Sequence, residues 1–339
     1  MKNIIIFAAK TGGHIFPALS FSKEALKNNN KVLVIDNFSN SKPEQILKIK
    51  NIFKENFEFT ELDLAKEYRQ LIKCIEVFRP DVVVHFAGLK AVGESQNNPI
   101  KYWDNNVVSS LNLVKAMALN KVKKLIFSSS ATVYGESKFQ PIPETAEIKS
   151  MSVYGSTKIA IENMFSEVAK EGIIDVVSLR YFNPVGSHKE KLICEDPLNS
   201  PNNLMPRIIR VALGIDKELK IYGNDYQTKD GSGERDYIHI SDLIDGHFSA
   251  IDFIFKTHGK KIFNLGTGKS TSVIELIKTF ELVNSIEIPF KISKRRPGDV
   301  AICYADPSLA KEVLDWQAKY NLSDMCRDAW VGVKDHGFN

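Results

Sequence analysis

Tyr154 and Lys158 have the spacing of a pair that moves a proton on a hydroxyl group. They open and close the segment YGSTK at residues 154–158, so on a helix both side chains lie on one face. A neighbouring ammonium stabilises tyrosinate, and we therefore expect Lys158 to lower the Tyr154 pKa from about 10 towards neutral. Such a tyrosine acts as a general base towards a substrate hydroxyl. The same spacing also fits a surface helix with a solvated lysine.

A cluster of hydroxyl side chains, Ser128 to Ser130 followed by Thr132, comes directly after the buried run Lys124–Phe127. If that run is a strand of a parallel sheet, its carboxyl end lies where such sheets bind ligands. The cluster also fits a capped turn. Taken with Tyr154, Ser130 predicts a Ser/Tyr/Lys set for hydride-transfer chemistry on a hydroxyl.

Asp36 stands at the end of a second buried run, Lys31–Ile35. An acid at the end of the second strand of a dinucleotide-binding unit accepts hydrogen bonds from a ribose 2′-hydroxyl and disfavours a 2′-phosphate. This position therefore favours NAD over NADP. Asp36 fits a turn residue equally well.

The first glycine loop departs from the pattern of a dinucleotide-binding loop. Such a loop uses three spaced glycines, and only Gly12 and Gly13 stand here. Pro17 predicts the opening of the following helix. Backbone amides at that helix start could still hold an anion.

Buried strands alternate with helices through the first half of the chain. The predicted strands are Ile4–Ala9, Lys31–Ile35, Phe57–Leu62, Pro80–His85, Lys124–Ser128 and Asp175–Arg180. The predicted helices between them are Pro17–Leu26, Lys66–Phe78, Pro99–Ala118 and Val153–Lys170. Repeated strand–helix–strand units build parallel sheets that are covered on both faces. We therefore predict an α/β fold with a doubly wound parallel (Rossmann) sheet in residues 1–184.

The second half is richer in loops. Residues 186–204 and 223–234 contain many Gly, Asn, Asp, Ser and Pro residues and are expected to be long loops. The predicted helices are Met205–Leu213, Ser241–Phe255, Ser272–Val283 and Pro307–Leu314, with a strand at Ile262–Leu265. Residues 185–339 are therefore expected to form a smaller C-terminal α/β substrate lobe, with the chain partly returning to the first domain.

Composition narrows the functional classes. A chain of 339 residues with 43% hydrophobic and 25% charged residues fits a soluble globular protein of about two domains. Its net charge of +4 is spread along the chain, which argues against nucleic-acid binding. No apolar run is long enough for a transmembrane helix, and the first is too short for a signal peptide. The four cysteines form no CxxC, so we expect a cytoplasmic protein, and the histidine spacing predicts no catalytic metal.

A series of motifs extends along most of the chain. The motifs are HFAGLKAVGES (85–95), SSSATVYG (128–135), YGSTK (154–158), LRYFNPVGSH (179–188), NNLMP (202–206), YGNDYQTKDGSGERDYIH (222–239), NLGTGKSTSV (264–273) and RRPGDVAICYAD (295–306). In this order they resemble the UDP-glucose 4-epimerases, a branch of the extended short-chain dehydrogenase/reductase family. The resemblance runs from about residue 31 to the C-terminus.

This resemblance implies NAD as cofactor and a UDP-sugar as substrate. Tyr154 would be the base, Lys158 its electrostatic partner and Ser130 a hydrogen-bonding group for the sugar 4-oxygen. The cofactor-binding residues would be Gly12, Gly13, Asp36, Asn37, Asp63, Leu64, Phe86, Ala87, Gly88, Lys90, Asn105, Tyr154, Lys158 and Phe182. The substrate-binding residues would be Lys90, Ser130, Tyr154, Asn183, Asn203, Leu204, Tyr222, Arg235, Arg296, Asp299 and Cys303.

The implied reaction is 4-epimerisation of UDP-glucose and UDP-galactose through a 4-keto sugar, with hydride passing to NAD+ and back. Arginine suits a diphosphate because guanidinium pairs with phosphate in bidentate fashion, although either arginine alone fits an ordinary surface residue. Cys303 stands where the family has either a tyrosine or a small residue, and the small residue is associated with room for a 2-acetamido group. UDP-GlcNAc is therefore an expected further substrate. The family also implies a homodimer built on helices within 99–118 and 153–170.

The N-terminus departs from the family pattern. The segment FAAKTGGHIFPALSFSKEAL resembles the opening glycine loop of the transferase that adds GlcNAc to the lipid-linked peptidoglycan precursor. Either the loop still seats the pyrophosphate through Gly12, Gly13 and adjacent amides, or it weakens NAD binding and leaves an inactive nucleotide-sugar binder. A 4,6-dehydratase is disfavoured, because no Asp-Glu pair follows Ser130. The interpretation of the chain as a glycosyltransferase is supported by this segment alone.

Overall fold

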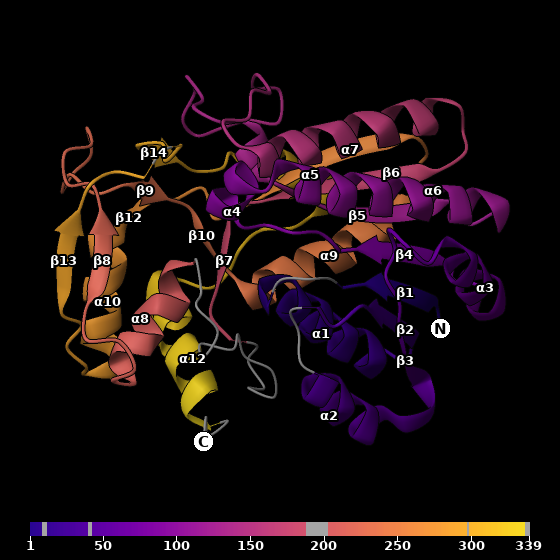
Figure 1. Cartoon of the computed structure of the whole chain (residues 1–339), viewed down its shortest axis with the longest axis horizontal. Coiled ribbons are helices and arrows are strands. Elements are labelled where there is room, and N and C mark those ends of the chain that lie inside the picture. The colour runs from indigo at the N-terminus through magenta and orange to yellow at the C-terminus, as the bar shows by residue number, and fades with distance from the viewer. Residues whose placement is uncertain (9–11, 40–42, 188–202, 297, 336–339) are drawn as a thin grey trace. The chain divides into compact units, whose positions relative to one another are not determined.

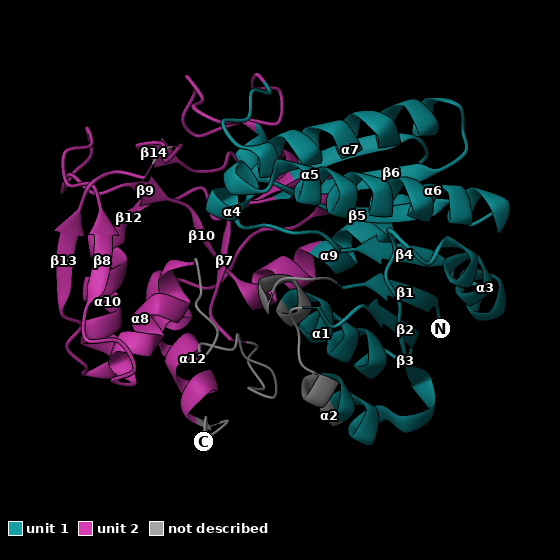
Figure 2. Cartoon of the chain, viewed as in Figure 1, with its two compact units in different colours: residues 1–133, 148–180, 247–263 teal, residues 134–147, 181–246, 264–339 magenta. Residues whose placement is uncertain are grey.

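The structure is a computed structural model that describes residues 1–8, 12–39, 43–187, 203–296 and 298–335 (Figure 1). The chain divides into two compact units, each built from separated segments (Figure 2). Unit 1 consists of Met1–Val133, Ile148–Arg180 and His247–Phe263. Unit 2 consists of Tyr134–Glu147, Tyr181–Gly246 and Asn264–Asn339. The predicted boundary after residue 184 lies near the change at Arg180, but residues 134–147 leave the first unit and 247–263 join it.

A seven-stranded sheet in the order β11-β6-β5-β4-β1-β2-β3 is the framework of unit 1. Its strands are β1 (Asn3–Phe7), β2 (Lys31–Asp36), β3 (Phe57–Glu61), β4 (Val82–His85), β5 (Lys124–Ser130), β6 (Asp175–Tyr181) and β11 (Lys260–Leu265). From β1 the chain adds β2 and β3 on one side and β4 and β5 on the other, all in parallel. This is the doubly wound arrangement that the sequence predicted.

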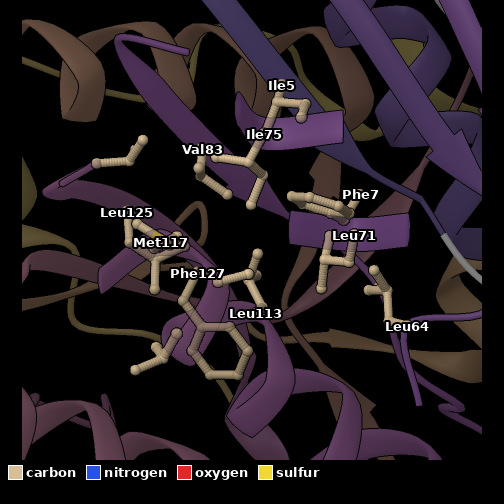
Figure 3. Close-up of a cluster of buried hydrophobic side chains, with 14 of the residues drawn as sticks. Ile5, Phe7, Leu64, Leu71, Ile75, Val83, Leu113, Met117, Leu125 and Phe127 are labelled. Atoms are coloured by element: carbon tan, nitrogen blue, oxygen red, sulfur yellow. The ribbon is translucent and has the colours of Figure 1, made fainter. Parts of the chain in front are cut away.

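The strands form where they do because their residues are apolar on both faces. In β1, Ile5 and Phe7 belong to the cluster drawn in Figure 3, with Val83 of β4 and Leu125 of β5. The alternate residue Ile6 points to the other face and is also fully buried. Helices cover the first face, and the side chains that they add to the cluster include Leu71, Ile75, Leu113 and Met117.

The helices of unit 1 follow the expected alternation. They are α1 (Gly12–Lys27), α2 (Pro43–Phe53), α3 (Tyr68–Phe78), α4 (Val92–Asn97), α5 (Pro99–Tyr102), α6 (Ser109–Leu119) and α7 (Val153–Lys170), with short helices η1 (Lys54–Asn56), η2 (Trp103–Val108) and η3 (Ala131–Val133). Pro17 lies inside α1, which begins at Gly12 rather than at the proline. None of the helices among the described residues is long and apolar enough to cross a membrane.

The predicted helix Pro99–Ala118 is interrupted. It consists of α5, the π-helix η2 and α6. Such π-helical turns are rare and often lie at functional sites. Here the wider turn includes the two buried asparagines Asn105 and Asn106. The interruption leaves no clear trace in the hydrophobic pattern, because Tyr102, Leu113 and Met117 are buried as in a continuous helix.

Unit 2 is built from short strands and amphipathic helices around its own core. Its strands are β7 (Asn183–Val185), β8 (Leu219–Tyr222), β9 (Glu234–Arg235), β10 (Tyr237–His239), β12 (Thr271–Ser272), β13 (Phe290–Ser293) and β14 (Ile302–Cys303). Its helices are α8 (Leu204–Ala212), α10 (Val273–Asn284), α11 (Ser308–Leu314) and α12 (Leu322–Asp335), while α9 (Ile240–Ile254) begins in unit 2 and ends in unit 1. The core includes Ile208, Ile221, Phe280 and Cys326. The four helices predicted in this half are present as α8 to α11.

Candidate active site

The start of α7 is held against its neighbours by residues that flank Tyr154. Ser152 caps the helix by accepting a hydrogen bond from Gly155 N at 3.1 Å. A Cβ at Gly155 would lie 2.0 Å from Ser150 Oγ and 2.8 Å from the Thr132 carbonyl oxygen. Only glycine therefore allows this close approach, which places Tyr154 at the end of β5.

The structure brings Ser130, Tyr154 and Lys158 together within unit 1. The Tyr154 phenol shares a hydrogen bond with Ser130. Thr132 donates its own hydroxyl to Ser130 Oγ at 3.0 Å, which leaves the Ser130 proton available for the phenol. Lys158 Nζ donates to the Ser128 carbonyl oxygen at 2.7 Å and lies 5.9 Å from the centre of the Tyr154 ring. We call Ser130, Tyr154 and Lys158 the catalytic set.

Burial controls the protonation of the catalytic set. Tyr154 is 5% exposed and Lys158 is fully buried. Burial raises the pKa of Tyr154 to about 12, against the opposing hydrogen bond from Ser130. Burial also lowers the pKa of Lys158 to about 7, against the attraction of Glu162. The prediction that Lys158 lowers the Tyr154 pKa towards neutral was wrong in direction, because the penalty for burying a charged phenolate dominates.

Several predicted cofactor residues line one small pocket in unit 1. The lining residues are Ala8, Asn37, Leu62, Asp63, Leu64, Ala87, Gly88, Asn105 and Ser109. Gly88 has φ of +147°, and a Cβ there would lie 3.2 Å from Asn106 Oδ1. The pocket wall is therefore formed where only glycine fits. Here the neighbour that requires glycine is the side chain of Asn106.

Asp36 and Asn37 are positioned at the end of β2. Asp36 is 1% exposed, and its Oδ1 accepts a hydrogen bond from Phe38 N at 2.8 Å, so it also serves as a turn residue. Asn37 donates from Nδ2 to Asp63 Oδ2 at 3.2 Å. Two of the predicted ribose- and adenine-binding residues are thus joined directly.

Other predicted cofactor residues have different surroundings. The Phe86 ring is fully buried and packs 4.9 Å from the His247 ring, so its side chain belongs to the core rather than to the pocket. Lys90 is half-buried. Gly12 and Gly13 open α1, and the loop residues 9–11 before them lie outside the described residues. Phe182 belongs to unit 2, where its amide donates to the Leu265 carbonyl oxygen at 3.2 Å.

The sequence analysis missed Asn106, which connects the pocket to α7. Its side chain accepts from Leu89 N at 2.7 Å and donates to Leu89 O at 3.0 Å. The same amide donates to Thr157 Oγ1 at 3.1 Å. Asn106 therefore holds the residues after Gly88 against the helix that carries Tyr154 and Lys158. A buried polar residue inside an apolar helical pattern is the signal that could have identified it.

Arginines and a tyrosine gather in unit 2 among the predicted substrate residues. The Arg296 guanidinium lies 4.6 Å from the centre of the Tyr222 ring and pairs with Asp299 at 3.0 Å. Arg207, which the sequence analysis missed, donates to the Tyr222 hydroxyl at 3.4 Å. These arginines lower the pKa of Tyr222, chiefly through the hydrogen bond from Arg207. We call Arg207, Tyr222, Arg235, Arg296 and Asp299 the arginine cluster.

Arg235 and Cys303 face each other on paired strands. Arg235 lies on β9 opposite Cys303 of β14, and its Nη1 donates to the Glu234 carbonyl oxygen at 2.8 Å. Cys303 is half-buried, and burial raises the pKa of its thiol to about 11. Tyr226 is under the electrostatic influence of Arg235, Arg296 and Asp299 together, which places the two parts of the cluster near one another.

The remaining predicted substrate residues are less directly engaged. Asn183 is half-buried and donates from Nδ2 to the Asp236 carbonyl oxygen at 3.0 Å. Asn203 is an exposed residue that precedes α8, and Leu204 opens that helix against the core of unit 2. Over the part of the chain that the structure describes, no group of three or more His, Cys, Asp or Glu side chains is placed to hold a metal ion.

Comparison with known proteins agrees with this arrangement. The family model "NAD dependent epimerase/dehydratase family" matches residues 11–266. A UDP-glucose 4-epimerase of Yersinia enterocolitica is 46% identical over 319 residues, with 93% of this chain and 94% of the relative covered. A UDP-glucose 4-epimerase of Bacillus subtilis is 42% identical over 322 residues, with 94% of each chain covered.

The solved structures that this chain resembles include further UDP-glucose 4-epimerases. The UDP-glucose 4-epimerase of Stenotrophomonas maltophila with bound NAD and formylated UDP-arabinopyranose has a TM-score of 0.93 and 38% identity, covering 99% of each chain. The Bifidobacterium longum enzyme in complex with NAD+ and UDP has a TM-score of 0.90 and 41% identity, covering 96% of this chain and 97% of that one. With a family model matched over most of its length and relatives this similar, the chain belongs to the NAD-dependent epimerase/dehydratase family.

Proposed function

We propose that the protein is a UDP-hexose 4-epimerase that interconverts UDP-glucose and UDP-galactose with NAD as cofactor. The observation that carries this proposal is the set formed by half-buried Ser130 at the end of β5 and the buried Tyr154 and Lys158 at the start of α7. Its residue types suit proton transfer on a sugar hydroxyl. The named relatives at 42% and 46% identity are UDP-glucose 4-epimerases, which supports this choice within the family.

The residues of unit 1 fit NAD. Asp36, Asn37 and Asp63 would bind the adenosine part, while Gly88 and its neighbours would allow close approach of the pyrophosphate and nicotinamide ribose. When bound, NAD would supply a hydride acceptor in its oxidised form and a hydride donor in its reduced form. Orientation, charge stabilisation and proton transfer come from the protein's own side chains.

Tyr154 would take the proton of the sugar 4-hydroxyl and return it at the end of the reaction. Only the phenolate form of Tyr154 can take that proton. Burial raises the pKa of the phenol to about 12 and disfavours the phenolate, so forming it needs a positive charge nearby and a hydrogen-bond donor. Lys158 provides the ammonium and Ser130 the donor. The pair thereby lets a buried tyrosine change its charge during each half-reaction.

Arg235 and Arg296 would bind the diphosphate of the UDP-sugar, with Tyr222 and Asp299 beside them. Guanidinium groups match phosphate oxygens in pairs, which suits them to a diphosphate. Asn183, Asn203 and Leu204 would complete the nucleotide-sugar contacts.

The decisive experiment measures cofactor and turnover together. Freshly purified protein is denatured and the released NAD is assayed, and a second sample is given UDP-galactose and scored for UDP-glucose. We expect stoichiometric NAD and conversion without added reductant. Absence of NAD, with no rise in Tm on adding it and no turnover, would instead favour the inactive nucleotide-sugar binder.

We also propose that UDP-GlcNAc is a substrate, because the half-buried Cys303 side chain is small. A UDP-Glc/GlcNAc 4-epimerase of Campylobacter jejuni, 29% identical with a TM-score of 0.83, shows that the family fold is compatible with both sugars. In a Cys303→Tyr protein, turnover of UDP-GlcNAc should fall by roughly tenfold or more, since added volume in a packed site clashes, while UDP-glucose turnover persists. Wild-type protein that uses UDP-glucose and rejects UDP-GlcNAc would contradict this proposal.

A cytoplasmic homodimer formed through α5 to α7 is a further part of the proposal. The side chains of Ile100 and Trp103 on this surface are 83% and 42% exposed. Exposed large apolar side chains often mark a surface that binds another protein chain. Light scattering should show a dimer that Ile100→Glu dissociates. Leu282→Glu, at an 80% exposed position on α10 of unit 2, serves as the matched control and should leave the dimer intact. A monomeric wild-type protein would refute the dimer.

A further inference from the structure

Helix α7 presents three side chains, one turn apart, to three consecutive residues at the end of β5. Tyr154 shares a hydrogen bond with Ser130, and Lys158 donates to the Ser128 carbonyl oxygen at 2.7 Å. One turn further along, Glu162 Oε1 accepts from Ser129 Oγ at 2.5 Å. Residues spaced by four share a helix face. Glu162 therefore continues the line of Tyr154 and Lys158, although neither the sequence motif nor the proposed reaction includes it.

Both oxygens of Glu162 are held in place from a second element. Arg180 on β6 donates from Nε to Oε1 at 3.0 Å and from Nη2 to Oε2 at 2.6 Å. The two side chains are only 4% and 3% exposed. A bidentate guanidinium–carboxylate pair is geometrically specific, and burial shields it from solvent screening. The Glu162–Ser129 bond therefore has a rigid support.

Glu162 also acts on the charge of Lys158. The Lys158 side chain is fully buried, and the attraction of Glu162 opposes the resulting fall in its pKa. The other titratable groups facing Lys158 are Tyr154 on α7 and His85 on β4. Burial lowers the His85 pKa to about 3, so that imidazole is neutral at working pH. Among the described neighbours, the stabilising negative charge comes from Glu162.

We propose that Glu162, braced by Arg180, is a positioning residue for the catalytic set, which holds the Ser129 side chain at the end of β5 and favours the charged form of Lys158. This inference rests on the proposed epimerase function. A buried Glu–Arg pair with a purely structural role would support the fold and leave the pH dependence of turnover unchanged. The proposal predicts that removing the carboxylate changes that dependence.

The test compares kcat and KM over pH for the holoenzyme and a Glu162→Gln protein. Glutamine keeps the shape and a hydrogen-bonding oxygen for Ser129 but removes the charge. Without that charge Lys158 loses its proton at lower pH, so the fall in kcat at the alkaline side should move down by about one pH unit. The KM for the UDP-sugar should stay unchanged. A Glu167→Gln protein is the matched control, because Glu167 lies on the same helix in an exposed pair with Lys170.

Loss of Glu162 leaves the Arg180 charge buried alone, which can prevent folding. A Glu162→Gln/Arg180→Met double variant removes both charges. Its shift should have the same direction but be smaller, because the Arg180 charge that repels the ammonium is lost as well. Glu162→Asp keeps the carboxylate, and we expect it to lower kcat while retaining the wild-type pH profile. An unshifted profile in either folded Gln variant overturns the proposal, as does failure of all three variants to fold. If the wild-type protein binds NAD without any turnover, the proposed function fails instead.

Discussion

The catalytic set of unit 1 and the arginine cluster of unit 2 differ in how far they are removed from water. Lys158 is fully buried and Tyr154 almost so, whereas the Arg296 side chain is 49% exposed. Burial shifts the pKa of Lys158 to about 7 and that of Tyr154 to about 12, each towards its neutral form. Arginine stays charged in water or protein. Groups whose pKa depends on burial thus lie in the catalytic set, which we call the dry region. The arginines lie in the solvent-exposed arginine cluster, which we call the wet region.

Under the proposed function, this difference would separate two tasks. A group that gives and takes a proton in each cycle must lie where its environment sets its charge. A group that attracts a diphosphate needs only a constant positive charge. It can lie in solvent, because its hydrogen bonds to the phosphate are strengthened by the charges of both partners. We therefore expect changes in unit 1 to act on kcat and on pH dependence. Changes in the arginine cluster should act mainly on KM and on salt dependence.

The largest expected effect is on kcat in a Tyr154→Phe protein. Without the phenol, no group in the catalytic set takes the proton of the sugar hydroxyl, so kcat should fall by roughly 10²–10⁴-fold. The content of bound NAD and the KM should change little, as assays of released NAD and initial rates will show. A Tyr154→Phe protein with near wild-type kcat would break the distinction between the two regions.

A Lys158→Met protein tests how much burial of the Lys158 charge lowers the free energy of unfolding. The pKa of Lys158 is lowered from 10.5 when unfolded to about 7 when folded, so the unfolded chain binds more protons between these values. The free energy of unfolding of the wild-type therefore carries a penalty below pH 7 that disappears as the pH rises towards 10. Relative to wild-type, Lys158→Met should be more stable at pH 7, by on the order of a few kcal/mol, and this advantage should shrink at pH 9.5.

Urea unfolding of both proteins at the two pH values measures this difference. Glu167→Gln again serves as a surface control with no expected pH trend. A stability difference that stays constant with pH would show that Lys158 titrates as an ordinary solvated lysine.

In the wet region, Arg235→Lys and Arg296→Lys should each raise the KM for the UDP-sugar. Lysine keeps the charge and loses the bidentate geometry, so we expect about a tenfold rise. Steady-state kinetics at two salt concentrations should show kcat and its pH profile unchanged. A shifted pH profile in either variant would contradict the division of tasks.

The smallest effect is expected for Arg207→Gln. Arg207 reaches the Tyr222 hydroxyl at 3.4 Å from a half-buried position, so its contribution is weak. KM should rise by less than about fivefold, because partly exposed charge contacts are screened by water. A larger rise would make Arg207 a direct contact of the substrate rather than a support for Tyr222.

The sequence predicted the alternating elements well because their signals are local. Runs such as Lys31–Ile35 and Asp175–Arg180 are rich in Val, Ile and Leu and form largely buried strands. The Tyr154–Lys158 spacing places both residues on one helix face. Ser130 could be placed with them because the carboxyl end of a parallel strand is a known site for ligands. These features need only short-range patterns and one rule of topology.

The features that could not be predicted from the sequence depend on contacts between residues far apart in the chain. The π-helical turn at η2 exists where Asn106 bonds to Leu89 and Thr157, and no local pattern encodes that packing. The direction of the Tyr154 pKa depends on its burial, which spacing does not reveal. The partners of Glu162 come from β5 and β6, so its place beside the catalytic set emerges only from the folded chain.

The order of strands in the central sheet has a consequence for synthesis on the ribosome. Strand β6 ends at Tyr181, but its outer neighbour β11 begins only at Lys260. At typical translation rates the roughly 80 intervening residues take about 4–16 s to emerge. During that time the nascent chain has β6 as an open sheet edge, which can pair with other chains. Chaperone binding to nascent chains should therefore peak while those residues are being translated.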